Sequence, residues 1–311
     1  MTRGAVLRLV AAGLLLAAVV HVADPAALAG SLLRADPRWL FAGLAAALLS
    51  NVASALRWRA LVTWLGAHIG WPFALLAYFR AMALNALLPG AVVGGDLYRA
   101  LALRQSGLPA LDAGLSVLLD RISGLWVLLA VASAAAPLAA PSLRQALPPG
   151  DIVLPSAVLT LLLLTAPLLL VVRPLDAAPG GRMRAALVRM QSRLRRARVL
   201  HQYALQMGAS FVVQMLSVAA FACGGRALGI DLPLAAWATA AAPVFLMAAL
   251  PVSVGGWGTR EAAAVAVLAA FAVPAAQAVA VAMLYGAFGL LQAALGGVLF
   301  ACRPQPLSRA R

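Results

Sequence analysis

The fold is decided by two breaks in otherwise apolar sequence, which read LLPGAVVGGDLYR at residues 87–99 and ALPVSVGGWGTR at residues 249–260. Each break contains Leu-Pro, a short spacer and then Gly-Gly-x-x-x-Arg. Because proline and glycine are unfavourable inside helices, each break is expected to divide an apolar segment into two shorter helices. The first glycines of the two pairs, Gly94 and Gly255, lie 161 positions apart, about half of the 311-residue chain.

A second match further along the chain supports an internal duplication. The sequence GLPA at residues 107–110 precedes one apolar run, and AVPA at residues 272–275 precedes another, with an offset of 165 positions. Two matches in the same order indicate two related halves. We expect these halves at residues 1–150 and 151–311.

The composition excludes a soluble globular protein. Hydrophobic residues make up 64% of the chain and charged residues 11%, whereas a soluble domain has about a quarter of its residues charged. A span across a hydrocarbon core about 30 Å thick needs about 20 apolar residues. Six runs approach or exceed this length: 5–22, 39–56, 113–137, 152–172, 202–224 and 277–302.

The distribution of charge predicts how these runs are oriented. Cytoplasmic loops of membrane proteins are enriched in basic residues. On this rule we expect the arginine-rich flanks to face the cytoplasm, namely Arg3, Arg8, Arg57, Arg59, the cluster Arg173–Arg198, Arg303, Arg309 and Arg311. The charge-balanced flanks are expected outside, namely Asp24, Arg34, Asp36, Arg38, Arg144, Asp151, Arg226 and Asp231. Both termini are then cytoplasmic.

These assignments favour an all-α polytopic membrane protein with six transmembrane helices and two opposed re-entrant hairpins, near 73–106 and 236–272. With three crossings in each half, the second half is inverted relative to the first, a design that recurs in transporters. In the alternative, each hairpin arm is a full span and the chain has about eight spans. The first run, 5–22, is expected to stay uncleaved, because the signal-peptidase-like Ala27-Leu28-Ala29 lies well beyond it.

The net charge of +15 predicts a membrane partner and no nucleic acid. All 24 basic residues are arginine, and eight of them fall in the predicted cytoplasmic loop 173–200. Within that loop, residues 182–200 have the periodicity of an amphipathic helix on an anionic inner leaflet. A solvated loop that only fixes topology is the alternative. Cys223 and Cys302 both lie in apolar runs, so no disulfide framework is expected.

The two breaks supply the candidate binding residues. In each break the glycine pair, Gly94-Gly95 or Gly255-Gly256, precedes a new helix, and backbone N–H groups at a helix N-terminus attract anions. Arg99 and Arg260 follow one turn later and are suited to bidentate contacts with a lipid phosphate. In the alternative, the glycines only form a turn, Arg99 pairs with Asp96, and Arg260 pairs with Glu261.

Other ionisable residues fall within apolar segments, where charges are costly and often functional. Asp120 and Arg121 lie seven to eight residues into an apolar run. Adjacent helix positions point about 100° apart, so each is expected to seek a partner on another helix. Asp120 is predicted to pair with Arg99 or Arg260. Asp96 and Glu261 complete the set of predicted pairing or substrate-contact residues.

No catalytic, metal or cofactor site is expected. His21, His68 and His201 are far apart and lack metal-ligand spacing. The sequence Val252-Ser253-Val254-Gly255 lacks the leading glycine of a nucleophile elbow. We therefore expect neither enzyme activity nor a cofactor.

The residues quoted above resemble the lysylphosphatidylglycerol synthase transmembrane (flippase-like) family. The resemblance covers nearly the whole chain and rests on NALLPG at 85–90, GGDLYR at 94–99, Asp120-Arg121 and PVSVGGWGTRE at 251–261. In fuller members the membrane region is associated with moving aminoacylated phosphatidylglycerol between leaflets, and a soluble domain makes that lipid. This chain stops at Arg311, so the resemblance implies a stand-alone membrane unit without the synthase activity.

Three functions follow from these observations. The leading hypothesis is a flippase-like transporter for an anionic or amphipathic lipid in a bacterial cytoplasmic (inner) membrane. Arg99 and Arg260 would bind the head group in it. The alternatives are a membrane-embedded transferase acting on a lipid-linked substrate, with Asp96 as its acid, and an accessory or scaffold subunit for a lipid-synthesis enzyme.

Overall fold

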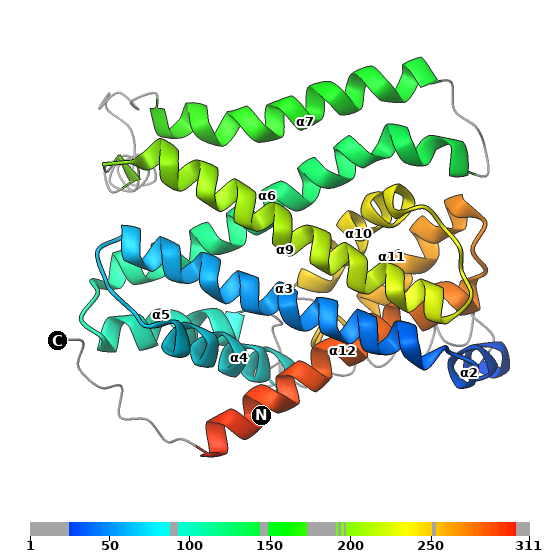
Figure 1. Ribbon diagram of the computed structural model, residues 1–311, viewed down its shortest axis with the longest axis horizontal. Helices are drawn as coiled ribbons and strands as arrows, with labels where there is room; N and C mark the ends of the chain where they lie inside the picture. Colours follow the sequence, from blue (N-terminus) through cyan, green and yellow to red (C-terminus); the bar gives the residue numbers. More distant parts are fainter. Residues whose placement is uncertain are drawn as a thin grey trace.

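A computed structural model describes residues 25–87, 93–143, 149–172, 191, 194–195, 197–250 and 253–302, and these residues form ten α-helices and no strand (Figure 1). The helices are α2 (Pro25–Leu33), α3 (Pro37–Trp64), α4 (Trp71–Leu87), α5 (Val93–Gln105), α6 (Ala110–Ala139), α7 (Pro149–Val172), α9 (Val199–Ala227), α10 (Leu234–Ala249), α11 (Thr259–Leu268) and α12 (Ala275–Cys302). Short 3₁₀ turns follow α6 and α11. The predicted all-α class is confirmed.

Five of these helices are long and apolar enough to cross a membrane, namely α3, α6, α7, α9 and α12. They correspond to the last five of the six predicted runs, and their ends lie within three residues of the predicted limits except at the end of α3, which continues to Trp64. The sixth run, 5–22, lies outside the described residues. The loop 173–200 and its predicted amphipathic helix also fall largely outside them.

The helices break at the two sequence motifs, as predicted. The expectation that the glycine pair precedes the new helix is wrong for the first break, because Gly94 and Gly95 lie in the first turn of α5. α4 ends at Leu87 and α5 begins at Val93, and the two helices pack against each other. α10 ends at Ala249 and α11 begins at Thr259, and this pair also packs together. The four arms have 10 to 17 residues, which gives lengths of about 15–26 Å. These lengths favour re-entrant arms over full spans of a core about 30 Å thick.

The packing between helices is matched in the two halves. α4 packs on α12, and α10 packs on α6, while α5 packs on α6 and α11 packs on α12. The most extensive packing joins α3 and α9, the long helices that precede the first and the second hairpin. This is the arrangement that two related units of one long helix, one hairpin and a second long helix would make. The boundary between the halves stays a prediction.

α3 and α9 run antiparallel, as equivalent helices of an inverted repeat must. At one end the backbone N–H of Asp36 donates to the carbonyl of Ala227 over 2.8 Å. At the other end the indole Nε1 of Trp64 donates to the carbonyl of Ala197 over 3.2 Å. The start of α3 therefore lies beside the end of α9, and the end of α3 lies beside the start of α9.

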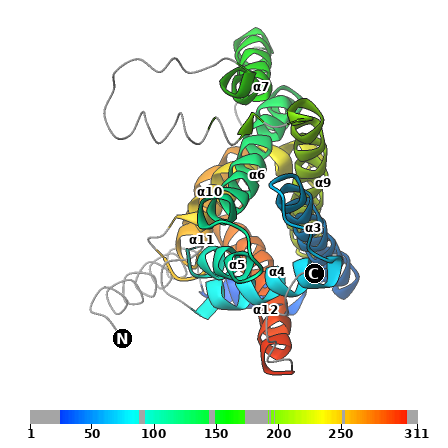
Figure 2. The ribbon, with the colours of Figure 1, turned by 90° about the vertical axis from the view of Figure 1, so that its left-hand side faces the viewer.

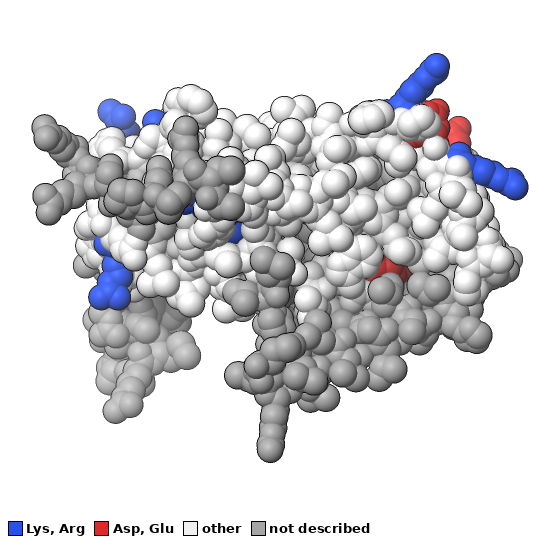
Figure 3. All heavy atoms as spheres, turned by 90° about the horizontal axis from the view of Figure 1, so that it is seen from below, with Lys and Arg blue, Asp and Glu red and all other residues white. Residues whose placement is uncertain are grey.

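Charged side chains on the surface gather towards the two ends of the molecule. In Figure 3 the blue and red spheres lie mainly at the ends of the long axis, and most of the described surface between them is white. At one end Arg226 lies 3.9 Å from Asp231. The apolar middle and charged ends are the distribution that a bilayer requires.

α7 is the most peripheral of the long helices. Figures 1 and 2 show it at the upper edge, above α6 and α9. Only 6% of its apolar window, Asp151–Leu168, is buried within the protein. Its leucine-rich surface is therefore left for lipid to cover.

Candidate functional site

A buried carboxylate, that of Asp120 in α6, joins three helices. Arg57 of α3 donates from Nε and Nη2 to its Oδ1, over 3.0 and 2.8 Å. Arg99 of α5 donates from Nη1 to its Oδ2 over 2.9 Å. The side chains of Asp120 and Arg99 are each 1% exposed. Both carboxylate oxygens are thus bound by guanidinium groups, as a charge removed from water requires.

Arg57 has further partners that fix it in place. Its Nη1 donates to the hydroxyl of Ser210 in α9 over 2.8 Å, and its Nη2 donates to the carbonyl of Asp120 over 3.0 Å. Gly124 faces the guanidinium, and a Cβ there would lie 3.2 Å from Nη1. The network therefore fastens α3 and α9 to α6 in the interior of the bundle.

The network continues towards the surface through Asp96. Arg99 donates from Nη2 to Asp96 Oδ1 over 2.9 Å. Arg121 also donates to Asp96, from Nη2 to Oδ1 over 2.9 Å and from Nε to Oδ2 over 3.0 Å. The Asp96 side chain is 22% exposed and that of Arg121 is 42% exposed. The chain of ion pairs thus runs from a fully buried carboxylate to a half-exposed guanidinium.

The charges of this network do not cancel. It contains three arginines and two aspartates, Arg57, Arg99, Arg121, Asp96 and Asp120. One positive charge is in excess, and the most exposed member is an arginine. An anionic group is therefore the ligand that this end of the network favours.

Asp120 pairs with Arg99, one of its two predicted partners. The two pairings that the alternative reading of the breaks predicted, Arg99 with Asp96 and Arg260 with Glu261, are also present. Arg57 was expected on the cytoplasmic flank, and this expectation is wrong, because α3 continues to Trp64 and carries Arg57 inside the helix. The apolar run appears to end at residue 56 only because two arginines interrupt it; the following Ala60, Leu61 and Val62 continue the apolar helix.

The second hairpin holds a separate ion pair between neighbouring residues. Arg260 donates from Nε and Nη2 to Oε1 of Glu261, over 3.0 and 2.5 Å. Glu261 Oε2 accepts the backbone N–H of Gly258 over 2.6 Å, which caps the start of α11. Glu261 turns back towards the helix N-terminus, and this brings its carboxylate within reach of the preceding arginine. Arg260 also lies over the ring of Trp257, 4.6 Å from its centroid.

Arg260 lines a pocket of about 240 Å³ between the two hairpins. The first hairpin contributes Met82, Asn85 and Ala86 from α4. The second contributes Arg260 with Trp257, and α12 closes the far wall. The residues that line it are Met82, Asn85, Ala86, Ala248, Gly255, Trp257, Arg260, Tyr285, Gly286, Gly289, Leu290 and Ala293. Arg99 does not line this pocket; it lies in the first network.

The two glycine pairs have different structural roles. Gly95 allows α5 to approach α4, because a Cβ there would lie 2.3 Å from the carbonyl oxygen of Ala81. Its N–H donates to Oδ1 of Asn85 over 2.7 Å. Gly255 and Gly256 have φ of 60° and 79°, a left-handed conformation that favours glycine. Head-group binding by these glycines, and by Gly94, stays a prediction.

Among the described residues, no group of three or more His, Cys, Asp or Glu side chains is placed to hold a metal ion. The ion pairs buried in the described interior join arginines to carboxylates. Their arrangement suits recognition of an anionic group.

Long apolar helices, two broken hairpins and buried ion pairs define a polytopic membrane protein with an arginine-lined pocket between the hairpins. The chain belongs to the family described as lysylphosphatidylglycerol synthase TM region, whose model matches residues 5–296. A search among curated proteins finds no significant match. Family membership indicates a multi-pass membrane protein with a membrane lipid-related function.

Proposed function

We propose that the protein is a flippase-like transporter that moves an anionic or amphipathic lipid between the leaflets of a bacterial cytoplasmic membrane. The observation that carries the proposal is the pocket between the two hairpins, with Arg260 in its wall. Broken helices at membrane depth are tolerated where they are buried in protein or line a wet cavity. A largely apolar pocket that is bounded by both hairpins and carries a guanidinium in its wall is therefore a suitable place for the head group of an amphipathic lipid in transit.

The lining of the pocket supplies complementary chemistry for a phosphate. Arg260 offers a guanidinium, and Asn85 lies on the opposite hairpin. The amide of Asn85 already accepts the N–H of Gly95, so it links the pocket to the start of α5. A shift of α4 would therefore alter both the pocket and the N-terminus of the helix that carries Arg99. This coupling supports alternating access around the hairpins.

The two arginines that the sequence singles out have different roles in this proposal. Arg260 contacts the head group, while Arg99 holds α5 against α6 through Asp120. Arg121 is the half-exposed end of the first network, and it attracts the anionic lipid before the lipid enters the pocket. We further propose that the Arg173–Arg198 loop contacts the anionic inner leaflet, that both termini are cytoplasmic, and that a lipid-synthesis enzyme supplies the lipid.

The proposal is tested by leaflet exchange of a labelled anionic lipid in proteoliposomes. The informative variant is Arg260→Gln/Glu261→Gln, because it removes both charges together and leaves no unpaired buried ion. A glutamine at position 261 retains an acceptor for the helix cap. We expect the exchange rate to fall at least about tenfold, the loss expected from one charge-assisted hydrogen bond.

Asp231→Asn is the matched control, because it removes an exposed carboxylate that does not line the pocket. It should exchange lipid like the wild type. Wild-type exchange by the double variant would exclude Arg260 from the head-group site. If the wild type exchanges no lipid but chemically modifies one in detergent, that result favours the transferase hypothesis.

A further inference from the structure

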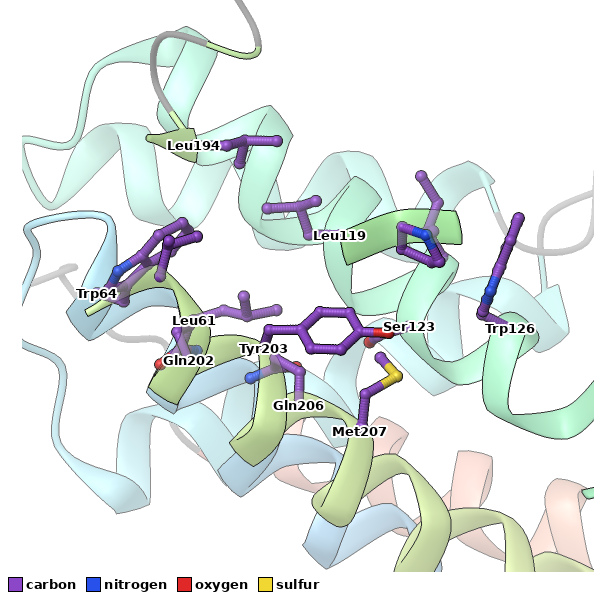
Figure 4. A pocket seen from close by; sticks show the side chains of 13 residues that line it. Leu61, Trp64, Leu119, Ser123, Trp126, Leu194, Gln202, Tyr203, Gln206 and Met207 are labelled. Carbon is purple, nitrogen blue, oxygen red and sulfur yellow. The ribbon is translucent and has the colours of Figure 1, made fainter. Parts of the chain in front are cut away.

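The pockets between the helices differ in the chemistry of their walls. The pocket shown in Figure 4, of about 120 Å³ between α3, α6, α7 and α9, is lined mainly by apolar side chains. A pocket of about 690 Å³ at the start of α3 is different, because two arginines, an aspartate and a glutamine line it. We call it the α2 pocket, since residues of α2 form one side of it. Its charged and polar groups make it a candidate for binding a polar ligand.

Two arginines, Arg34 and Arg226, are brought to the α2 pocket by the contact between α3 and α9. The backbone N–H of Asp36, at the start of α3, donates to the carbonyl of Ala227, at the end of α9, over 2.8 Å. Arg34 lies two residues before Asp36, and Arg226 lies one residue before Ala227. Both arginines therefore line the same pocket although they are far apart in the sequence.

Both guanidinium groups are accessible to a ligand. Arg34 is exposed, and its side chain makes no hydrogen bond or ion pair within the part of the chain that the structure describes. Arg226 is 46% exposed, and its guanidinium lies over the ring of Trp39, 5.1 Å from the centroid. This cation–π contact covers a face of the guanidinium and leaves its N–H donors available. Its contact with Asp231 is 3.9 Å long and solvated, so it competes weakly with a ligand.

The wall of the α2 pocket carries an excess of positive charge. Asp36 supplies the only carboxylate among the described residues that line it. This carboxylate accepts the backbone N–H of Arg38 over 2.8 Å and caps the N-terminus of α3. Two guanidinium groups thus accompany one carboxylate that is held by the helix end. The wall therefore favours an anion, and guanidinium groups are suited to the oxygens of a phosphate.

A related pocket at the other end of α3 has different chemistry. Gly66 follows the C-cap of α3, Gly229 follows the C-cap of α9, and both have positive φ, 105° and 77°. Asp112 and Gln277 are the third residues of α6 and α12, and 277 minus 112 gives 165, the offset found between the halves. Gly66 and Asp112 line a pocket of about 360 Å³, whereas Gly229 and Gln277 line the α2 pocket. The equivalent position thus carries a carboxylate at one end and a neutral amide at the other.

We propose that the α2 pocket binds a phosphate group. Arg34 and Arg226 donate charge-assisted hydrogen bonds to the phosphate oxygens, and the amide of Gln277 donates a further one. The neutral amide matters because a carboxylate at position 277 would repel the anion. The phosphate belongs to a lipid head group or to a soluble phosphate ester, and the two sources are separated by the test. The inference rests on the proposed function only in taking such a lipid to be the transported one.

Isothermal titration calorimetry of the detergent-purified protein tests the inference with two probes that share a phosphate monoester. One probe is dihexanoyl phosphatidic acid, and the other is glycerol phosphate, which lacks the acyl chains. Protein-free micelles provide the blank titration. We expect saturable binding of at least one probe. Tighter binding of the lipid assigns the pocket to a head group, and equal binding of both probes assigns it to soluble phosphate esters.

Three variants locate the binding. Arg34→Gln/Arg226→Gln removes both guanidinium groups and should weaken binding at least about tenfold, the loss expected from one charge-assisted hydrogen bond. Gln277→Glu keeps both arginines but introduces the carboxylate of the related pocket, and it should weaken binding to a similar extent. Arg38→Gln removes an exposed arginine of α3 that does not line the pocket, and it should bind like the wild type.

The same titrations of Arg260→Gln/Glu261→Gln separate the α2 pocket from the pocket between the hairpins. Binding should persist in this variant, and its loss would place the phosphate at Arg260 and overturn the inference. Binding of neither probe by the wild type would also overturn it, as would binding that the double arginine change and Gln277→Glu leave unaltered. Binding at the α2 pocket in a wild type that exchanges no lipid would contradict the transport proposal alone.

Discussion

Arg99 and Asp120 form an ion pair 2.9 Å long between α5 and α6, and each side chain is 1% exposed. The pair attaches the second arm of the first hairpin to a long membrane helix. In the second half, the corresponding arginine, Arg260, pairs with its own neighbour, Glu261. At the offset of 165 found between the halves, the position that matches Asp120 is Tyr285, which lines the pocket with Arg260. The second hairpin is therefore not fixed to its long helix by a matching ion pair.

Asp120→Asn should destabilise the protein strongly. The change leaves Arg57 and Arg99 buried without their shared counter-charge, and breaking a buried pair costs about 3–5 kcal/mol. Thermal unfolding of the detergent-purified protein measures the loss. Asp231→Asn, at an exposed pair 3.9 Å long, should change stability little. Equal melting of the Asp120→Asn variant and the wild type would contradict the role given to this network.

Gly296→Ala should loosen the contact between α12 and α4. A Cβ at Gly296 would lie 2.0 Å from the carbonyl oxygen of Phe79, so the helices must move apart. Overpacking of this kind costs about 1–3 kcal/mol. Gly297→Ala on the same helix meets nothing within 4 Å and should melt like the wild type. If both variants melt alike, the close approach of these helices is not as described.

Gly286→Ala should impair transport while leaving the fold intact. The added methyl would lie 2.1 Å from Nη2 of Arg260, and the end of a flexible side chain can move away. The guanidinium is then displaced from its place in the pocket. The exchange rate of an anionic lipid should fall about tenfold. Gly297→Ala serves again as the control, and wild-type exchange by Gly286→Ala would show that the position of Arg260 is immaterial.

Arg121→Gln should reduce the preference for anionic lipids. Arg121 is 42% exposed and carries the charge that the two aspartates leave unbalanced. Its ion pair is close to the surface and contributes little to stability, so the variant should fold normally. The ratio of exchange rates for anionic and zwitterionic lipids measures the effect. Arg104→Gln changes an exposed arginine of α5 and should keep the wild-type ratio.

Much of the fold is predictable because membrane burial imposes simple rules on sequence. The long apolar runs predicted the five described spans within three residues except at the end of α3, and the Leu-Pro and Gly-Gly motifs located both helix breaks. Inverted topology followed from arginine-rich flanks, and the antiparallel course of α3 and α9 agrees with it. These features depend on composition and periodicity, which are local properties of the chain.

The pairing of side chains is less predictable because it depends on helix rotation and on distant contacts. Asp120 required a partner from another helix, and Arg99 was among those foreseen. Arg57 was missed because a charge near the end of an apolar run usually marks the membrane surface. The pairing of Arg260 with Glu261, which the alternative reading predicted, is present, and it forms between adjacent residues because Glu261 turns back to cap Gly258.

The attachment of α7 to its neighbours had no signal in the sequence. Pro167 predicts a local distortion of a helix, but the hydrogen bond that Trp126 of α6 donates to the carbonyl of Leu163 depends on how α6 and α7 lie side by side. Such contacts emerge only when the helices are placed in space.

The most direct test of the account is leaflet exchange of a labelled anionic lipid, comparing protein-free vesicles with vesicles that contain the wild type or Arg260→Gln/Glu261→Gln. The account predicts exchange well above the protein-free rate for the wild type, and a fall of at least about tenfold in the double variant. Exchange by the wild type at the protein-free rate, or unchanged exchange by the double variant, would contradict it.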